Sequence, residues 1–463
     1  MKYYLVTLIL IGLYACGANS ELNKIEKDQF AEAKSLYASN CASCHGQQMA
    51  MFVDRNWKHG SDPDSLALSI KKGYPDDGMP AFEALFSEEQ VQELVKYITY
   101  GIDNRESFSF DDPFNPDTIF ETDGLKYRLE LISDEVDVPW GYAFLPDNSM
   151  LITDISGELY HRSVEGELQE IGNVPEVVHA GQGGLMDVEL DPDFETNNLV
   201  YISYSKGKDD KQTTAVIRAK LGEKQLEDVT EIFEALPYLS TRHHYGGRLE
   251  FDPDGYLMIT VGDRGRRDDN PQSLENHCGK VHRINSDGSI PQDNPFVGQA
   301  NAMESIYSYG HRNPQGLIYD ADRGIMWEHE HGPRGGDELN IVRKGENFGW
   351  PVVSFGINYN GTTFTNKTEM EGMTEPEKYW VPSIAPCGMA LVYSDLYPEW
   401  KGDLLIGSLR FKYVTKVSED MSEVSMLKNI GRVRNVKLDR EGYIYVSVEE
   451  PGAIYKLIPI LEN

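Results

Sequence analysis

Two cysteines and a histidine occur in the order C-x-x-C-H within residues 40–49, NCASCHGQQM. The thiols of Cys41 and Cys44 have the spacing that bonds the two vinyl groups of one haem, and the adjacent His45 is then delivered to the iron as proximal ligand. A redox or zinc pair is the alternative for an isolated motif of this kind. Haem attachment requires a second iron ligand further along the chain.

A methionine in a loop is the expected distal ligand, and Met79 stands in the sequence GMP. Met49 and Met51 are rivals, but they follow the motif so closely that we interpret them as packing residues. An amphipathic helix should then begin at Ser87. With these features residues 26–103 resemble a class I cytochrome c, a small all-α domain that carries a covalent haem c and transfers electrons.

The first twenty residues, MKYYLVTLILIGLYACGANS, start with a positive charge and continue as an apolar run too short to span a bilayer comfortably. Cys16 follows a small residue, as in the lipobox of bacterial lipoproteins. We interpret residues 1–16 as a lipoprotein-type signal peptide with Cys16 as the lipidation site; an ordinary cleaved signal is the alternative. The expectation is an exported protein of the bacterial cell envelope, facing the periplasm or the cell surface and attached to a membrane by its lipid.

Export also affects the two remaining cysteines. Cys278 and Cys387 can form a disulfide in an oxidising compartment or remain as two buried free thiols, and the sequence leaves both open.

The chain of 463 residues is longer than one hydrophobic core usually organises, so at least two domains are expected. Its formal net charge of −32 at pH 7 repels nucleic acid and anionic membrane surfaces, which makes both poor partners. Residues 104–122 are polar, contain two prolines and have no clean period, which predicts a linker.

One pattern recurs in the part of the chain that follows, residues 123–463. It is a strand, a tight turn rich in Asp and Pro, and a second strand rich in β-branched or aromatic residues. The five copies are YAFLPDNSMLITD, VELDPDFETNNLVYISY, LEFDPDGYLMITVGD, LIYDADRGIMWEHE and VKLDREGYIYVSVEE. Repetition of one hairpin predicts an all-β propeller, with a long β-sandwich or two tandem sandwiches as the alternative.

Several longer segments make the comparison more specific. RHHYGGRLEFDPDGYLMITVGDRGR, GKVHRINSDGSIPQDNPF, IYSYGHRNPQGLIYD, EHGPRGGDELNIVRKGENFGWP and GRVRNVKLDREGYIYV resemble, in this order, segments of the soluble quinoprotein glucose dehydrogenase family. The resemblance covers approximately residues 125–460 and includes the aldose sugar dehydrogenases that depend on pyrroloquinoline quinone (PQQ). It implies a six-bladed propeller with PQQ and Ca²⁺ at the wide end of the central channel.

The resemblance also implies roles for four arginines and an asparagine. Arg432, Arg434 and Arg410 would hold the PQQ carboxylates, Asn313 would contact the cofactor, and Arg312 would lie near the reactive quinone carbonyl. Arginine suits this task because its planar fork binds a carboxylate through two hydrogen bonds. Arg432 and Arg434 alternate along an expected strand, so both side chains should point to one face.

Calcium would take the backbone carbonyls of Gly332 and Pro333, since it is a hard cation that prefers oxygen ligands. Glu338 would join a second, structural calcium site, or else be an ordinary exposed acid. His331 stands where the glucose enzymes have Gln, a departure that bears on substrate preference.

His244 matches the general base of the family, and histidine titrates near neutral pH without large perturbation. Asp263 is expected to pair with His244 and orient its ring, while Gln182 matches a substrate-binding glutamine. His243 replaces an Asp of the glucose enzymes and is expected on the substrate side. Because neighbours on a strand face opposite ways, we expect the two histidine rings to point apart and not to share a metal ion.

The sequence therefore predicts an exported oxidoreductase that oxidises an aldose at C1 with PQQ and Ca²⁺ and passes electrons to its own c-type haem, then to a downstream acceptor such as another cytochrome or a respiratory chain. Two other readings use the same fold: a non-catalytic propeller that binds carbohydrate or a partner, and a calcium-dependent hydrolase.

Overall fold

The computed structural model describes residues 30–41, 45, 59–75, 79–103, 115, 117–359, 362–449 and 452–460. The signal peptide with Cys16, most of the predicted linker, and Cys44 lie outside these residues. The chain forms two compact units, one of residues 1–73 with 81–110 and one of residues 74–80 with 111–463. They are described separately below.

Within its described residues the first unit has three helices: α2 (Ala31–Asn40), α5 (Pro63–Lys72) and α6 (Glu88–Asp103). The sequence sets their ends. Asp62 caps α5 by accepting a 3.0 Å hydrogen bond from Ser65 N, and a proline occupies the first turn. Before α6, Ser87 Oγ accepts from Gln90 N while Gln90 Oε1 accepts from Ser87 N, a capping box that confirms the predicted helix start.

The helices of this unit share one apolar core. Tyr37 and Leu94 are fully buried in it, and the parallel rings of Phe82 and Phe86 stack with centroids 5.2 Å apart. Among the described helices, none combines the length and apolarity needed to cross a membrane.

The second unit is a six-bladed β-propeller, as the sequence predicted. Five blades each contain four consecutive antiparallel strands, and the sixth contains five. The first two blades are β3 (Pro139–Phe144), β4 (Met150–Asp154), β5 (Leu159–Arg162), β6 (Leu168–Ile171), and β7 (Leu185–Leu190), β8 (Leu199–Lys208), β9 (Lys211–Leu221), β10 (Leu226–Glu234). The next two are β11 (Leu249–Phe251), β12 (Leu257–Val261), β13 (Lys280–Ile284), β14 (Ile306–Tyr309), and β15 (Pro314–Asp320), β16 (Ile325–Glu330), β17 (Asp337–Val342), β18 (Lys378–Trp380). The last two are β19 (Pro386–Leu391), β20 (Leu404–Ser408), β21 (Tyr413–Val417), β22 (Glu423–Met426), and β23 (Val433–Leu438), β24 (Ile444–Glu449), β25 (Gly452–Pro459) with β2 (Leu125–Ser133) and β1 (Ile119–Thr122).

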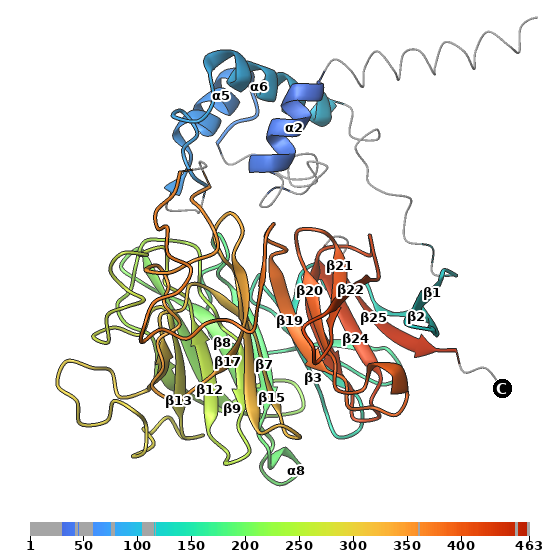
Figure 1. Cartoon of the computed structure of the whole chain (residues 1–463). Helices are drawn as coiled ribbons and strands as arrows, with labels where there is room; N and C mark the ends of the chain where they lie inside the picture. The colour runs from blue at the N-terminus through green and yellow to red at the C-terminus, as the bar shows by residue number, and fades with distance from the viewer. Residues whose placement is uncertain are drawn as a thin grey trace, which may run out of the picture. The chain divides into compact units, whose positions relative to one another are not determined.

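The last blade joins the two ends of the propeller sequence. Figure 1 shows β2 beside β25, and these strands pair from Tyr127 opposite Pro459 to Ser133 opposite Ile454. Strand β1 occupies the last four residues of the segment predicted to be a linker. This closure leaves the ring without an open seam between its first and last blades.

The five recurring hairpins of the sequence are the first two strands of five blades. Their aspartates build the turns: Asp252 Oδ1, for example, accepts hydrogen bonds from Asp254 N at 3.0 Å and Tyr256 N at 2.9 Å. The corresponding hairpin of the fifth blade, β19–β20, has a longer connection that contains the short 3₁₀-helix η2 (Pro398–Trp400). It lacks the tight Asp turn, which is why the sequence pattern missed it.

The first strand of each blade lines the central channel, and in a propeller these strands run in the same direction. The residues predicted to act in catalysis or cofactor binding either precede or open these strands or follow the second strand of a blade. Because the second strand runs antiparallel to the first, both groups gather at one end of the channel. Short α8 (Phe194–Asn197) lies in a turn of the second blade.

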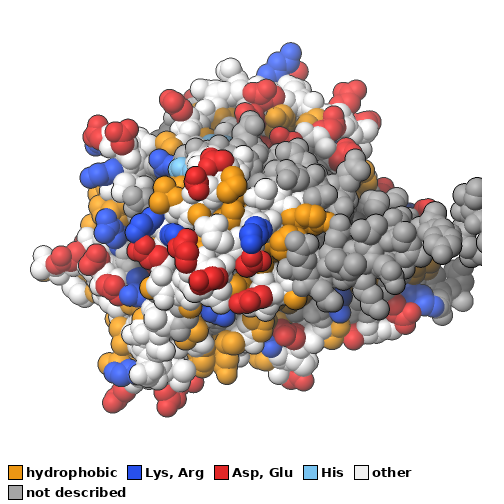
Figure 2. Space-filling model, turned by 90° about the horizontal axis from the view of Figure 1, so that it is seen from above, with side chains coloured by type: hydrophobic (Ala, Val, Ile, Leu, Met, Phe, Trp, Pro, Cys, Tyr) orange, Lys and Arg blue, Asp and Glu red, His pale blue; other side chains and the backbone are white. Residues whose placement is uncertain are grey.

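The surface carries side chains of both charges. In Figure 2 acidic and basic side chains are interspersed over the face in view, with apolar side chains among them.

Candidate active site at one end of the propeller channel

His244 and Asp263 form the centre of the site. His244 Nδ1 lies 2.6 Å from Asp263 Oδ1, the contact that the sequence predicted. The other carboxylate oxygen accepts a 2.8 Å hydrogen bond from the indole of Trp350, and Gly265 N donates to Oδ1 at 2.7 Å. Asp263 is 1% exposed. The carboxylate is thus fixed on both oxygens, and it leaves Nε2 of the imidazole as the nitrogen available to a substrate.

The protonation states suit a base. Burial raises the pKa of Asp263, but the charges and hydrogen bonds of His244, Arg312 and Trp350 outweigh it and lower the pKa to about 2. Burial and then the positive charge of Arg312 lower the pKa of His244, against the opposing effect of Asp263. At neutral pH the pair is therefore a carboxylate and a neutral imidazole whose Nδ1–H donates to the carboxylate.

The expected orientation of His243 is wrong. Its ring contacts the His244 ring edge-on, with centroids 4.5 Å apart. His244 has a φ of 58°, which is left-handed rather than extended, so the two side chains do not alternate as on a strand. Burial lowers the pKa of His243 to about 3, and its buried Nδ1 has no hydrogen-bond partner. Gln182 Oε1 accepts from His244 N at 2.7 Å, so this glutamine also holds the strained turn.

Arg312 and Asn313 enter the channel at the start of β15. Both backbone N–H groups donate to Glu330 Oε2, and Arg312 Nη1 donates to the carbonyl of His331 at 2.9 Å. The Arg312 guanidinium lies 5.3 Å from the ring of Trp350. Asp263 N in turn donates to the Arg312 carbonyl at 2.7 Å, so the arginine and the catalytic pair are parts of one bonded network.

Arg432 and Arg434 point to the same side, as their alternation predicted, and they share Glu449. Arg432 Nε donates to one carboxylate oxygen at 3.0 Å and Arg434 Nε to the other at 2.6 Å. Burial raises the pKa of Glu449, but Arg434 and Arg432 outweigh it and hold the pKa at about 2. One carboxylate between two guanidiniums leaves this group with a net positive charge. Sequence reasoning missed Glu449, Trp350 and Glu330.

Arg410 follows β20. Its Nη1 donates to the carbonyl of Ser383 at 3.0 Å, and its guanidinium lies 4.9 Å from the ring of Phe411.

The two propeller cysteines are not bonded to each other. Arg434 Nη1 lies 3.1 Å from the sulfur of Cys387. Cys278 and Cys387 are both buried and free, so they form no disulfide and the free-thiol alternative holds.

A glycine-rich loop, residues 332–336, follows β16. A Cβ on Gly332 would lie 2.1 Å from the carbonyl oxygen of Gly336, so the backbone closes more tightly than any side chain would allow. Asp337 anchors the loop by accepting from Gly332 N at 2.8 Å and from Ala385 N at 2.8 Å. The ring of His331 is turned to the carbonyl of Pro386, with its Nε2 at 2.8 Å, and burial lowers its pKa well below the usual range. His331 therefore presents its backbone, not a free imidazole, at this point.

Glu338 lies beside a second group of potential cation ligands. It stands opposite Glu330 in the β16–β17 ladder, and burial followed by the charge of Glu330 raises its pKa well above the usual range. In this part of the propeller, ligand atoms of His311, Glu328 and Glu330 lie within 4.8 Å of one another. His311 Nδ1 and Glu328 Oε1 are buried without hydrogen-bond partners.

Of the predicted haem-binding residues that the structure describes, Cys41 and His45 lie in the first unit, whereas Met79 lies in a segment grouped with the propeller. Cys41 and His45 are joined by a helical hydrogen bond of 3.0 Å from His45 N to the Cys41 carbonyl, so both side chains lie on one side of that turn. Met79 forms a small antiparallel bridge with Tyr74, in the segment 74–80 that clusters with the propeller unit. The pairing of His45 with Met79 stays a prediction.

The fold and the site can be compared with known proteins. Residues 136–456 match the family model described as glucose/sorbosone dehydrogenase. The chain belongs to this family. It is 42% identical over 345 residues to the aldose sugar dehydrogenase YliI of Escherichia coli K12, which covers 72% of this chain and 93% of that relative.

Two further comparisons agree with this assignment. The crystal structure of the soluble aldose sugar dehydrogenase from Escherichia coli in its apo-form has a TM-score of 0.69 and 40% identity, covering 72% of this chain and 100% of that one. Quinoprotein glucose dehydrogenase B of Acinetobacter calcoaceticus is 31% identical over 287 residues, 55% of this chain and 59% of that relative. Residues 28–98 match the model of cbb3-type cytochrome c oxidase subunit III, which confirms an N-terminal cytochrome c domain.

Proposed function

We propose that this protein oxidises an aldose at C1 with PQQ and Ca²⁺ and passes the electrons to its own c-type haem. The observation that carries the proposal is the network in which Trp350 and Asp263 hold a neutral His244 beside Arg312. The names of the two enzyme relatives support an aldose as substrate, and that of the Acinetobacter relative supports a quinone cofactor.

The residues present fit PQQ. The cofactor is a tricarboxylate, and Arg432, Arg434 and Arg410 offer three guanidinium groups, of which Arg432 and Arg434 share the single carboxylate of Glu449. When bound, PQQ supplies the two-electron acceptor that the protein itself lacks. Asn313 stands at the same end of the channel, where Gly246 N donates to its side-chain oxygen at 3.2 Å.

The glycine-rich loop 332–336 fits a calcium ion, since its carbonyl-lined turn leaves no room for a side chain at Gly332. Gly332 and Pro333 would hold the ion through backbone oxygens, and the ion would act as a Lewis acid. A second, structural ion would be held by Glu338 with the buried group of His311, Glu328 and Glu330, whose partnerless atoms suit a cation.

In catalysis His244 would accept the proton of the C1 hydroxyl, while the C1 hydrogen leaves as a hydride to the two-electron acceptor that PQQ would supply. The sugar would then leave as a lactone. Asp263 keeps Nε2 directed at the substrate and stabilises the imidazolium that forms. Arg312 stabilises negative charge that develops on the acceptor side. Gln182 and His243 stand next to His244 and would contact the sugar ring.

The cytochrome domain gives the electrons a destination. Cys41 and Cys44 would hold a haem covalently, with His45 and Met79 as iron ligands. Electrons would then pass to a further cytochrome or a respiratory chain. We also propose that the protein is an exported lipoprotein of the bacterial cell envelope, lipidated at Cys16.

The proposal is tested by loading the purified full chain with PQQ and Ca²⁺ and measuring dye reduction with glucose, xylose and maltose. We expect an activity that requires both additions and that His244→Ala lowers by about 10²- to 10⁴-fold. PQQ affinity of this variant should be unchanged, because His244 does not bind the cofactor carboxylates. PQQ binding without activity toward every sugar would show that the substrate class is wrong.

A further inference from the structure

A second pocket lies in the channel, lined by residues from five of the six inner strands. Its volume is about 480 Å³, within the range of small-molecule sites. Its lining comes from β7, β11, β15, β19 and β23, from Arg248 just before β11, and from the turns that follow β15 and β19. The candidate active-site residues lie at the start of these strands or at the end of the antiparallel second strands. The turn residues Ala321, Asp322 and Tyr393 instead follow the ends of β15 and β19, so this far pocket extends toward the other end of the channel.

Arg248 separates the two sites. Its Nε donates to the Gln315 carbonyl at 2.8 Å and its Nη2 to the Arg434 carbonyl at 3.0 Å, on the side of the candidate active site. Its Nη1 lies 3.4 Å from Oδ1 of Asp187, which lines the far pocket, and the guanidinium stacks at 4.0 Å on Trp140 near the start of β3. The far pocket is therefore a distinct site whose inner end is closed by a fixed side chain.

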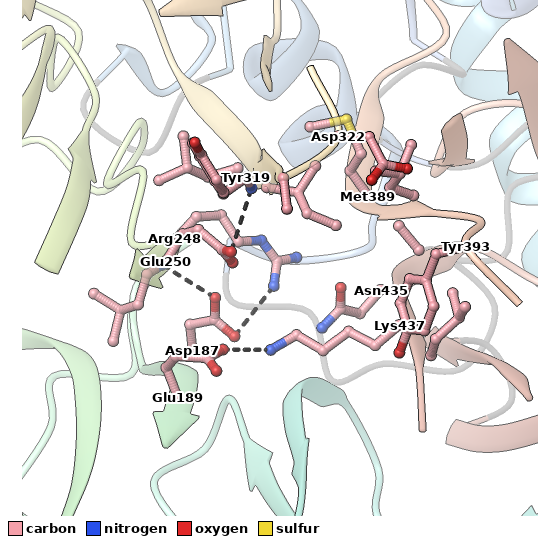
Figure 3. A pocket seen from close by; sticks show the side chains of 17 residues that line it. Asp187, Glu189, Arg248, Glu250, Tyr319, Asp322, Met389, Tyr393, Asn435 and Lys437 are labelled. Atoms are coloured by element: carbon pink, nitrogen blue, oxygen red, sulfur yellow. Dashed lines mark hydrogen bonds and ion pairs between the residues drawn. The ribbon is translucent and has the colours of Figure 1, made fainter. Parts of the chain in front are cut away.

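The charges in the far pocket cancel in pairs. Arg248 pairs with Asp187, and Lys437 Nζ lies 2.8 Å from Glu189 Oε2, as the dashed lines in Figure 3 show. The remaining buried carboxyl is Glu250, which accepts from Tyr319 N at 3.2 Å. Burial and then the charge of Glu189 raise its pKa to about 8, so it is protonated at neutral pH. The buried charges therefore balance, and the exposed Asp322, which also lines the pocket, adds one carboxylate. This lining disfavours anions and suits a neutral polar ligand.

Hydrogen-bonding groups in the pocket are incompletely used. Asn435 is 2% exposed and its side-chain nitrogen has no hydrogen-bond partner, although it lines the pocket and lies between Arg248 and Lys437 in Figure 3. Arg248 Nη1 also lacks a hydrogen-bonded partner. Buried donors of this kind are normally satisfied, so their exception calls for an acceptor that enters the pocket.

The mouth adds apolar and aromatic surface. Tyr393 is 55% exposed there, with Tyr319 and the side chains of Met389 and Leu391 on the walls. We propose that the far pocket binds a neutral sugar, whose hydroxyls offer acceptors to Asn435 and Arg248 and donors to Glu189, and whose C–H faces pack on the tyrosines. This site would be non-catalytic and independent of His244.

The probe is methyl α-D-glucopyranoside, which is blocked at C1 and cannot be oxidised there. Its binding to the full chain is measured by calorimetry and by ligand-observed NMR. We expect binding that Tyr393→Ala and Asn435→Leu each weaken by about tenfold or more. Because Tyr393 is exposed, its variant should fold even if Asn435→Leu does not. Val164→Ala, an exposed apolar change in another blade, and His244→Ala should leave the affinity unchanged.

The proposal is wrong if the folded Tyr393→Ala protein binds the probe as the wild type does, or if His244→Ala alone abolishes binding, which would place the sugar in the active site. Absence of probe binding to the folded wild-type protein would also overturn it. Dye-linked activity of Tyr393→Ala should equal that of the wild type, so the far pocket and the proposed catalytic function are tested separately.

Discussion

Replacing Glu449 by Gln should weaken PQQ binding without changing the chemistry of the sugar. The carboxylate accepts from Nε of both Arg432 and Arg434 and so fixes two guanidinium planes toward the channel. In the variant an amide faces one arginine with its own donors, so at least one side chain loses its fixed position. Re-ordering two long side chains on binding costs about 0.5–1.5 kcal/mol each, which corresponds to a Kd for PQQ raised roughly tenfold to a hundredfold. Breaking the buried group should also destabilise the apo-protein by about 3–5 kcal/mol.

Quenching of protein fluorescence by PQQ gives the Kd, and urea unfolding gives the stability. Glu189→Gln is the matched control, since it also removes a carboxylate from a channel ion pair, with Lys437, but away from the candidate active site. It should reduce stability and leave the PQQ Kd unchanged. At saturating PQQ the Glu449→Gln protein should retain the wild-type KM for glucose. Tighter PQQ binding in this variant would refute the reasoning, because it would show that Glu449 competes with the cofactor for the arginines.

Three further results are expected. Asp263→Asn should lower kcat/KM by about a hundredfold or more. It should also move the acidic limb of the profile of kcat/KM against pH to lower pH, because Asp263 raises the pKa of His244. An acidic limb at the same pH in the variant would contradict the interaction between Asp263 and His244. For Glu250 the folded-state pKa, about 8, lies above its usual value, so its contribution to stability is lost as the pH rises from about 4.5 to 8. Urea unfolding across this range should show that loss in the wild type and less of it in Glu250→Gln, and equal pH dependence of the two proteins would count against a protonated Glu250. Removal of Ca²⁺ by a chelator should lower the melting temperature of the wild-type protein. Glu328→Gln should show a smaller decrease, because this variant loses a ligand of the second calcium site at His311. An equal decrease in the wild type and the variant would show that no calcium binds at the His311 group.

The local elements were accessible from the sequence because their causes are local. The aspartates of the hairpin turns bond backbone groups a few residues away, as Asp252 and Asp439 do at two and four residues. A repeated turn therefore indicates a repeated blade. Ser87 and Gln90 cap α6 over three residues. The fifth-blade hairpin escaped because a longer connection with η2 replaces that turn.

The parts of the site that were missed depend on distant contacts. Trp350 reaches Asp263 across 87 positions, and no local pattern announces that bond. Glu449 could have been predicted from the sequence, because it lies opposite the arginines in the β23–β24 hairpin. There Glu449 N donates to the Arg432 carbonyl at 2.9 Å. The orientation of His243 could not, because it depends on the left-handed φ of His244, which the strand-like sequence around it conceals.

The central claim is that sugar oxidation in the propeller reduces the haem of the same chain. Anaerobic stopped-flow mixing of the protein, loaded with PQQ and Ca²⁺, with glucose tests it most directly by following the haem absorption bands. The account predicts that the haem is reduced only when sugar, PQQ and Ca²⁺ are present together, and that His244→Ala abolishes this reduction. The rate constant of haem reduction should not depend on protein concentration, because both centres belong to one chain. A haem that stays oxidised while the bound PQQ is reduced by sugar would contradict it.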